Sequence, residues 1–387
     1  MKIGIITFHH VDNYGATLQA YALWNFLNSQ GYDVEIIDYR PTKIAWIYFR
    51  SLLPIKRVKI NINENKKIRI NEKSFINISR AWKMRRFLLS NLKLSNRKVY
   101  SKKGLEYYKD KYDVIICGSD QVWCLDSFRG YNSSFFLDFV NNTTTRKISY
   151  AASFGNTIKL GDFQKEIYTL INQFQSISVR DSNSLKIITN ECEKEAVKVL
   201  DPTFLINYDA LKRPPKIKDQ YLLLYIQSDM ETEEEYFIKL LAEEKNLTIV
   251  SVGKYNQLAQ INLEAASPKE WIGLYSQASY IVTNTYHGAV FSIIFKKLFN
   301  VFVPNDKSNK VTDLLIDLGL QNRIFSDQLK YQILSKQIFD IDYKTVHEIL
   351  ESKILESKKY LVEAITQGVV DSRSNVEYNK EYKGVDV

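Results

Sequence analysis

The fold is decided by the stretch Tyr280-Ile281-Val282-Thr283-Asn284-Thr285-Tyr286-His287-Gly288-Ala289-Val290-Phe291-Ser292-Ile293-Ile294-Phe295. Its first four residues are typical of a short buried strand, and the apolar run from Ala289 is typical of a helix. We expect a polar turn between them, with His287 and Gly288 where the helix begins. The unpaired N–H groups and the dipole of a helix N-terminus favour an anion, and a histidine there can add a proton donor. The stretch therefore predicts an anion site at the carboxyl end of a strand.

Alternating strands and helices surround this stretch. We expect strands at 221–227, 248–252 and 298–303 and helices at 231–245, 269–277 and 311–318, with 306–310 as a charged loop. The punctuation Arg213-Pro214-Pro215 precedes the first of these strands. This order predicts an α/β domain with a parallel sheet.

The N-terminal half has the same organisation. Lys2–Thr7 is a predicted strand, 8–16 a polar loop and Thr17–Gln30 a helix closed by Gly31, followed by a strand at Asp33–Tyr39. Further strands are expected at 112–117, 147–152, 176–179 and 196–200, each followed by polar residues. Ligands of open α/β sheets bind at such strand ends, whereas the GxGxxG fingerprint of dinucleotide sites is missing.

These patterns divide the 387 residues into two Rossmann-like α/β domains, 1–205 and 206–340, at roughly 150 residues per domain. We expect a long amphipathic C-terminal helix at 341–367 and a disordered tail at 368–387.

A basic insertion at 42–103, expected to be helical around 81–90, interrupts the first domain. From Arg40 to Lys103 the chain has 19 Lys and Arg against two Glu, a net +17, so the other residues together carry −8. Such a segment is either a solvated insertion or a surface for an anionic partner. Anionic lipid, as a peripheral membrane contact, and a lipid-phosphate substrate fit equally well as its partner, and nucleic acid is not expected.

Metal and membrane-spanning classes are disfavoured. The three cysteines have no ligand spacing and only four histidines exist, which predicts no metal site and reduced thiols. The N-terminus does not resemble a signal peptide and no apolar run reaches about 18 residues, so we expect a cytoplasmic protein, acting at the inner face of a membrane if the basic segment contacts lipid.

Two Rossmann-like domains followed by a helix resemble the GT-B arrangement, in which the ligand lies between the two domains. Six motifs in order, over roughly 2–325, resemble the polysaccharide pyruvyl transferase family: Asn13-Tyr14-Gly15-Ala16 with Leu18-Gln19-Ala20-Tyr21, Gly118-Ser119-Asp120-Gln121-Val122-Trp123, Ser149-Tyr150-Ala151-Ala152-Ser153-Phe154-Gly155, Ser178-Val179-Arg180-Asp181, Asp201-Pro202-Thr203, and Tyr286-His287-Gly288 with Phe291-Ser292-Ile293. The resemblance implies transfer of pyruvate from phosphoenolpyruvate to a sugar of a surface polysaccharide or exopolysaccharide, without a metal or other cofactor. The sugar acceptor could be lipid-linked.

Three residues are the expected catalytic groups. Arg180 offers a planar fork for carboxylate or phosphate, or else pairs with Asp181 or a neighbouring acid. His287 could donate to the phosphate or act as general acid, or else cap the turn. Asp120 could accept a proton from an acceptor hydroxyl, or else cap a helix.

Five more residues are expected to bind substrate. Asn13 and Gly15 could hold the acceptor or phosphate at the first helix, with an Asx-turn as the alternative for Asn13. Gln121 lies at the strand end beside Asp120. Gly288 would let a ligand approach the backbone, or else serve helix–strand packing. Lys310 could contact phosphate, or else be a solvated charge.

Four other positions bear on the same cleft. His9 and His10 are weaker candidates for it. Thr285 occupies the place where many family members carry arginine, and Asn284 the place where others carry aspartate. The first difference removes a cation, and the second removes a charge that could orient His287.

Two other functions remain open from the sequence. A GT-B glycosyltransferase would use the same cleft and helix N-terminus for a sugar nucleotide. A non-enzymatic protein would instead dock at membranes through the basic 40–103 segment.

Overall fold

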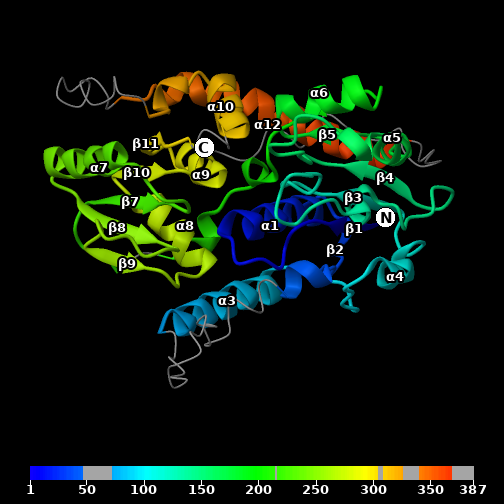
Figure 1. Cartoon of the computed structure of the whole chain (residues 1–387), viewed down its shortest axis with the longest axis horizontal. Coiled ribbons are helices and arrows are strands. Elements are labelled where there is room, and N and C mark those ends of the chain that lie inside the picture. The colour runs from blue at the N-terminus through cyan, green and yellow to red at the C-terminus, as the bar shows by residue number, and fades with distance from the viewer. Residues whose placement is uncertain (47–71, 214–215, 304–307, 326–339, 368–387) are drawn as a thin grey trace, which may run out of the picture.

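Two parallel sheets lie side by side, each covered by helices (Figure 1). The computed structural model describes residues 1–46, 72–213, 216–303, 308–325 and 340–367. The expected tail at 368–387, residues 47–71 of the basic insertion, and residues 306–307 of the expected charged loop fall outside these residues.

The first sheet has the strand order β2-β1-β3-β4, and all its pairs are parallel. Its strands are β1 (Lys2–Ile6), β2 (Asp33–Ile36), β3 (Val114–Cys117) and β4 (Arg146–Ser149). The short pair β5 (Ser178–Val179) and β6 (Val197–Lys198) extends it through single bridges from Ile148 to Ser176 and from Ala152 to Val179. The predicted strands are confirmed, although most are shorter than the apolar runs suggested.

Different helices cover the two faces of this sheet. Helices α1 (Tyr14–Ser29) and α12 (Tyr343–Thr366) pack on one face. Helices α5 (Gln164–Ile171) and α6 (Ser182–Glu191) pack on the other, while the short α4 (Lys102–Leu105) lies near the β2 edge. The two-sided covering explains why the central strands β1 and β3 are almost entirely apolar and buried.

Helix α1 begins earlier than the sequence suggested. The expected loop at 8–16 ends at Asn13, whose side chain accepts a hydrogen bond from the Ala16 N–H (3.0 Å) and caps the helix. Gly15 therefore lies in the first turn of α1 and not in a loop. The predicted end is confirmed, because Gly31 follows the helix with φ +82°.

The second sheet has the order β11-β10-β7-β8-β9, again entirely parallel. Its strands are β7 (Tyr221–Tyr225), β8 (Thr248–Val252), β9 (Ile261–Leu263), β10 (Tyr280–Thr283) and β11 (Leu298–Val301). Helix α7 (Thr232–Lys245) covers one face, and α8 (Pro268–Gln277), α9 (Tyr286–Ile294) and α10 (Ser308–Asp317) cover the other. Strand β9 was not predicted.

The basic insertion contributes a structural helix. Helix α3 (Glu72–Asn91) is twice as long as expected and lies beneath both domains (Figure 1). Met84 and Phe87 join the core that contains α8 and α9, and Leu88 joins the core on β1 and β2. At least this part of the insertion is therefore not a solvated excursion but a brace between the domains.

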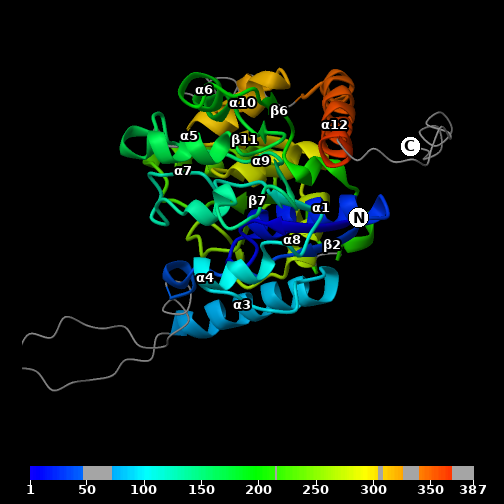
Figure 2. The ribbon, with the colours of Figure 1, turned by 90° about the vertical axis from the view of Figure 1, so that its right-hand side faces the viewer.

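Helix α12 connects the domains on the side away from α3 (Figures 1 and 2). Its first half packs on the second domain through Val346 and Leu350. Its second half returns to the first domain, where the Ser357 hydroxyl accepts from the Leu200 N–H (2.9 Å) and the Ala364 carbonyl accepts from Arg146 Nε (2.7 Å). Both braces hold the facing strand ends of the two sheets at a fixed separation.

Candidate active site

The predicted strand–turn–helix around His287 is confirmed as β10, a turn and α9. Thr285 caps α9, since its hydroxyl accepts from the Gly288 N–H at 3.0 Å. His287 lies in the first turn and is 9% exposed. The helix therefore directs this imidazole towards the first domain.

His287 contacts two residues of the first domain. Its Nε2 lies 3.5 Å from Asp201 Oδ2. Its ring lies against Gly15, where a Cβ would be 2.2 Å from His287 Nδ1. Gly15 thus provides the space that lets the histidine reach across the domain boundary, and this contact is the role that the structure gives it.

Asp201 joins the cationic groups of the site and has no exposed surface. Its Oδ2 accepts from Arg180 Nη1 (2.8 Å) and the Ser119 hydroxyl (3.1 Å), while its Oδ1 accepts from the Thr203 N–H and hydroxyl. Burial alone would raise the pKa of Asp201, but His287 and Arg180 hold it well below its usual range. Asp201 belongs to one of the six motifs, but no role was predicted for it. Its position at the end of a predicted strand could have indicated a site residue.

Arg180 follows β5 and is almost fully buried. Besides Asp201, it has Asp120 Oδ1 at 3.9 Å and the ring of Tyr286 at 4.3 Å from its guanidinium carbon. Burial opposes its charge, yet Tyr286 and the two carboxylates raise the pKa of Arg180 above its ordinary value. The arginine therefore remains a cation, and its acidic partner is Asp201 and not Asp181, which accepts from Ser153 and Ser184.

Asp120 follows β3 in a left-handed conformation with φ +82°, which is uncommon for a non-glycine residue. Its Oδ1 accepts from the Gln121 N–H at 2.8 Å. Burial would raise the pKa of Asp120, but Arg180 and His287 together lower it. Asp120 is thus an ionised carboxylate at neutral pH, held in a strained position beside the cleft.

The ends of both sheets enclose a hollow of about 240 Å³ between the domains. Five predicted site residues line it: Asn13, Asp120, Gln121, His287 and Lys310. Arg180 lies directly behind them, and Gly15 lies under the histidine. Arg129, for which no role was predicted from the sequence, also lines the hollow. The structure thus brings together side chains from strand ends far apart in the sequence.

Lys310 lies in the first turn of α10 and not in the expected charged loop. Burial and the nearby Arg180 lower the pKa of Lys310 to about 8. Among the described residues it has no ion-pair partner. It is therefore a cation directed at the hollow, which favours the binding role over a solvated charge.

Gly288 is closely packed on the side where a Cβ would lie. A Cβ on it would be 2.1 Å from Thr283 Oγ1 and 2.7 Å from Thr285 Oγ1. The space beside its Cα is thus occupied by the hydroxyls that shape the turn, which agrees with the packing alternative.

Asn284 does not orient His287. Its Oδ1 accepts from the Gln227 N–H (2.8 Å) and its Nδ2 donates to Ser228 Oγ (2.5 Å). The carboxylate beside the histidine is Asp201 of the other domain, so a side chain at 284 is not needed for that purpose.

The N-terminal histidines have other surroundings. His9 is buried, with Nε2 3.1 Å from Asp38 Oδ1 and Nδ1 3.1 Å from the Thr7 carbonyl oxygen. Burial and Arg40 lower the pKa of His10 to about 4, and its Nε2 lies 3.4 Å from Arg85. Neither is among the residues that line the hollow.

No group of metal-ligating side chains occurs in the described part of the chain. Within these same residues, no helix is long and apolar enough to cross a bilayer. The three cysteines are buried and free.

Several solved structures have a fold similar to this one. The protein UGT89C1 of Arabidopsis thaliana in complex with UDP-L-rhamnose has a TM-score of 0.52 at 12% identity, over 94% of this chain and 98% of that one. A putative UDP-N-acetylglucosamine 2-epimerase of Listeria monocytogenes has a TM-score of 0.50 at 7% identity, over 95% and 96%. This chain also covers 66% of a mutant O-GlcNAc transferase of Thermobaculum terrenum, with a TM-score of 0.48 at 10% identity over 94% of this chain. At sequence identities this low, the similarity shows the fold alone, and it confirms the GT-B-like arrangement.

No curated protein matches the sequence. The model of the family described as polysaccharide pyruvyl transferase matches residues 13–306, about three quarters of the chain, which includes every motif from Asn13 to His287. The chain therefore belongs to the polysaccharide pyruvyl transferase family, and it is a transferase.

Proposed function

We propose that this protein transfers pyruvate from phosphoenolpyruvate to two hydroxyls of a sugar in a surface polysaccharide or exopolysaccharide. The observation that carries the proposal is that His287 and Lys310 line one small hollow between the domains, with Arg180 3.9 Å from Asp120, which also lines it. A small donor with a carboxylate and a phosphate needs several cations, and it needs no metal if side chains supply them. The proposed reaction uses no cofactor.

Donor binding would use charges and helix ends together. Lys310 is free to pair with phosphate, and the first turn of α9 adds the positive end of a helix dipole. Arg180 is fixed by Asp201, so it could contact the carboxylate without first being ordered. Asn13 and Gln121 supply neutral polar groups to the same hollow.

The chemistry needs one acid and one base. Protonation of the donor's methylene carbon, for which His287 is the proposed acid, leaves an oxocarbenium-like centre at the carbon that bears the phosphate. One sugar hydroxyl forms a C–O bond there, the bond to the phosphate oxygen breaks, and a second hydroxyl closes the ketal. One of the two hydroxyl protons replaces the proton that the acid gave to the methylene carbon, and the other leaves on the phosphate.

Asp120 is the proposed base for the attacking hydroxyl. Asp120 is ionised at neutral pH and can therefore accept a proton, and its strained backbone fixes the carboxylate beside Arg180. The acceptor sugar, lipid-linked or free, would enter from the open side of the hollow.

Thermal shift measurements with phosphoenolpyruvate and with several sugar nucleotides test the donor class. We expect phosphoenolpyruvate to raise the melting temperature of the native protein and to lose that effect in His287→Ala. The matched control is His347→Ala, which removes a 42% exposed histidine of α12 paired with Glu351. A shift with sugar nucleotides alone would refute the proposal in favour of a glycosyltransferase.

A further inference from the structure

Helix α3 has an apolar stripe that faces away from the protein. Phe75, Ile78, Trp82 and Leu89 are 66%, 43%, 58% and 58% exposed, although the helix buries its opposite side in both domains. Their spacing of three, four and seven residues puts them on one face of a helix. Four large exposed apolar residues in one row are unusual in a folded protein and mark an interaction surface.

The charged residues that follow Glu72 in this segment have a single sign. No acidic residue occurs after Glu72 until the segment ends at Lys103. Arg86 lies within the stripe, with its guanidinium carbon 5.3 Å from the centre of the Trp82 ring. A row of aromatic and aliphatic side chains with arginine and no carboxylate is complementary to an anionic lipid surface.

Other cations of the segment are already neutralised. Arg80 pairs with Asp12, Lys83 with Glu270 and Lys93 with Asp33. These three cations are therefore not free for an anionic surface, whereas Arg86 lies on the exposed face of α3 and has no ion pair with another described residue.

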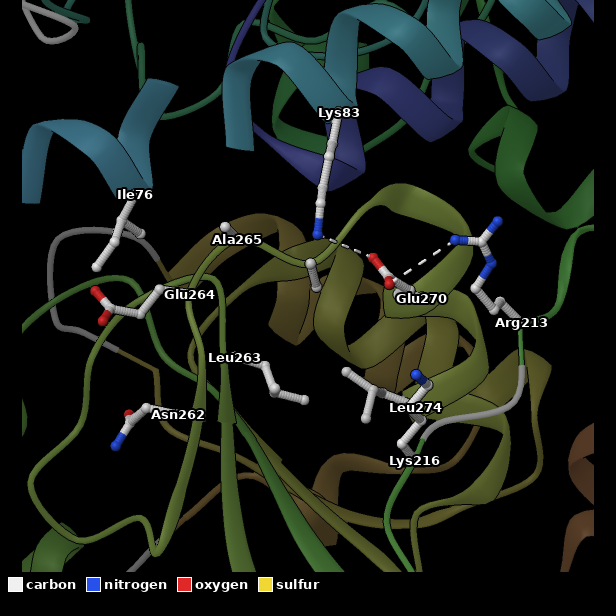
Figure 3. A pocket seen from close by; sticks show the side chains of 11 residues that line it. Ile76, Lys83, Arg213, Lys216, Asn262, Leu263, Glu264, Ala265, Glu270 and Leu274 are labelled. Carbon is white, nitrogen blue, oxygen red and sulfur yellow. Dashed lines mark hydrogen bonds and ion pairs between the residues drawn. The ribbon is translucent and has the colours of Figure 1, made fainter. Parts of the chain in front are cut away.

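The hollow on the neighbouring flank of α3 does not compete as an anion site. It measures about 500 Å³, and Lys83 of α3 points across it to Glu270, which Arg213 also approaches (Figure 3). Lys216 also lines the hollow, but so does Glu264, so carboxylates lie among its cations and an anion would meet charges of both signs.

We propose that the exposed face of α3, made of Phe75, Ile78, Trp82, Arg86 and Leu89, docks on a bilayer that contains anionic phospholipid. The helix lies flat in the interface, with the apolar side chains among the acyl chains and Arg86 at the phosphates. This contact is independent of the reaction proposed above.

Docking through α3 would place the cleft next to the membrane. Arg80 Nε donates to both carboxylate oxygens of Asp12 (2.8 and 2.9 Å), and Arg85 Nη1 lies 3.4 Å from His10 Nε2. Both partners belong to the loop that ends at Asn13, a residue of the hollow. An acceptor carried on a lipid would thus approach the molecule on the side where α3 lies (Figures 1 and 2).

Co-sedimentation of the full chain with phosphatidylcholine vesicles, with and without phosphatidylglycerol, tests the proposal. We expect binding only when phosphatidylglycerol is present, weaker binding at high salt, and a roughly tenfold or larger loss of affinity in Trp82→Ser or Leu89→Ser. The matched control is Leu355→Ser, because Leu355 is also a helical leucine at 58% exposure but lies on α12.

Three results would overturn it: no binding, equal binding to both kinds of vesicle, or equal binding by Leu89→Ser and Leu355→Ser. Self-association that Leu89→Ser abolishes, without vesicle binding, would also overturn it and assign the stripe to a second copy of the chain. Circular dichroism of each variant checks that the fold persists.

Discussion

Replacement of Asp201 by asparagine tests the claim that one buried carboxylate holds both Arg180 and His287. Asparagine keeps the shape of the side chain and one oxygen that can accept from Thr203. Its amide NH2 group then replaces the Oδ2 that accepts from Arg180 and Ser119, and an NH2 group cannot accept from either. Arg180 would be left buried, with its next carboxylate oxygen 3.9 Å away. Removing one partner of a buried pair costs about 3–5 kcal/mol, and we expect a loss of stability in this range.

Urea unfolding of Asp201→Asn, Arg180→Met and the double variant measures this loss. The double variant should be less destabilised than the sum of the single variants by about 2–3 kcal/mol, because no unpaired charge remains buried. The control is Asp209→Asn, which removes a 68% exposed partner of Lys212 and should cost less than about 1 kcal/mol. A cost for Asp201→Asn as small as that control, or strictly additive costs, would refute the reasoning.

The stability that Asp201→Asn loses should depend on pH in one direction. The folded pKa of Asp201 lies below its unfolded value of about 3.9, so its contribution is complete above about pH 4 and is lost as the pH falls through the folded value. The stability difference between the native protein and Asp201→Asn should therefore shrink in acid.

Three further variants test other contacts. Gly15→Ala would place a Cβ 2.2 Å from His287 Nδ1, so we expect phosphate release from phosphoenolpyruvate to fall roughly tenfold or more while circular dichroism is unchanged; normal turnover would exclude this contact from the site. Lys310 has a pKa of about 8, so donor affinity should weaken as the pH rises through that value, whereas Lys310→Arg should remain flat; parallel profiles would contradict the binding role. Arg80→Met removes the bonds from α3 to Asp12 and should cost roughly 1–3 kcal/mol in urea unfolding, and an unchanged midpoint would argue against α3 as a brace.

The sequence was informative where a pattern is local. The strand and helix around His287 follow from residues that are neighbours in the chain, and the end of α1 follows from Gly31. The start of α1 was misjudged because Gly15 suggested a loop. Its presence in a helix has a tertiary cause, since only a residue without a Cβ leaves room for the His287 ring.

Long-range contacts could not be read from the chain. The partner of Arg80 is 68 residues away, and that contact helps to make α3 a brace where an insertion was expected. The carboxylate that serves Arg180 is 21 residues away, after another strand. Periodicity identifies which face of an element is buried, but it does not identify which charge on another element will meet it.

The residues next to His287 in the sequence therefore do not indicate how much charge the site contains. Asn284 and Thr285 make the motif itself neutral, yet Asn284 binds Gln227 and Ser228, and Thr285 caps α9. The charge enters from elsewhere: Asp201 from the first domain and Lys310 from α10. Because the groups come from both domains, their spacing depends on how the domains are held together. It follows that variants in the braces α3 and α12 should alter donor affinity even though they touch no ligand, and that the absence of a charged residue beside the histidine need not weaken the site.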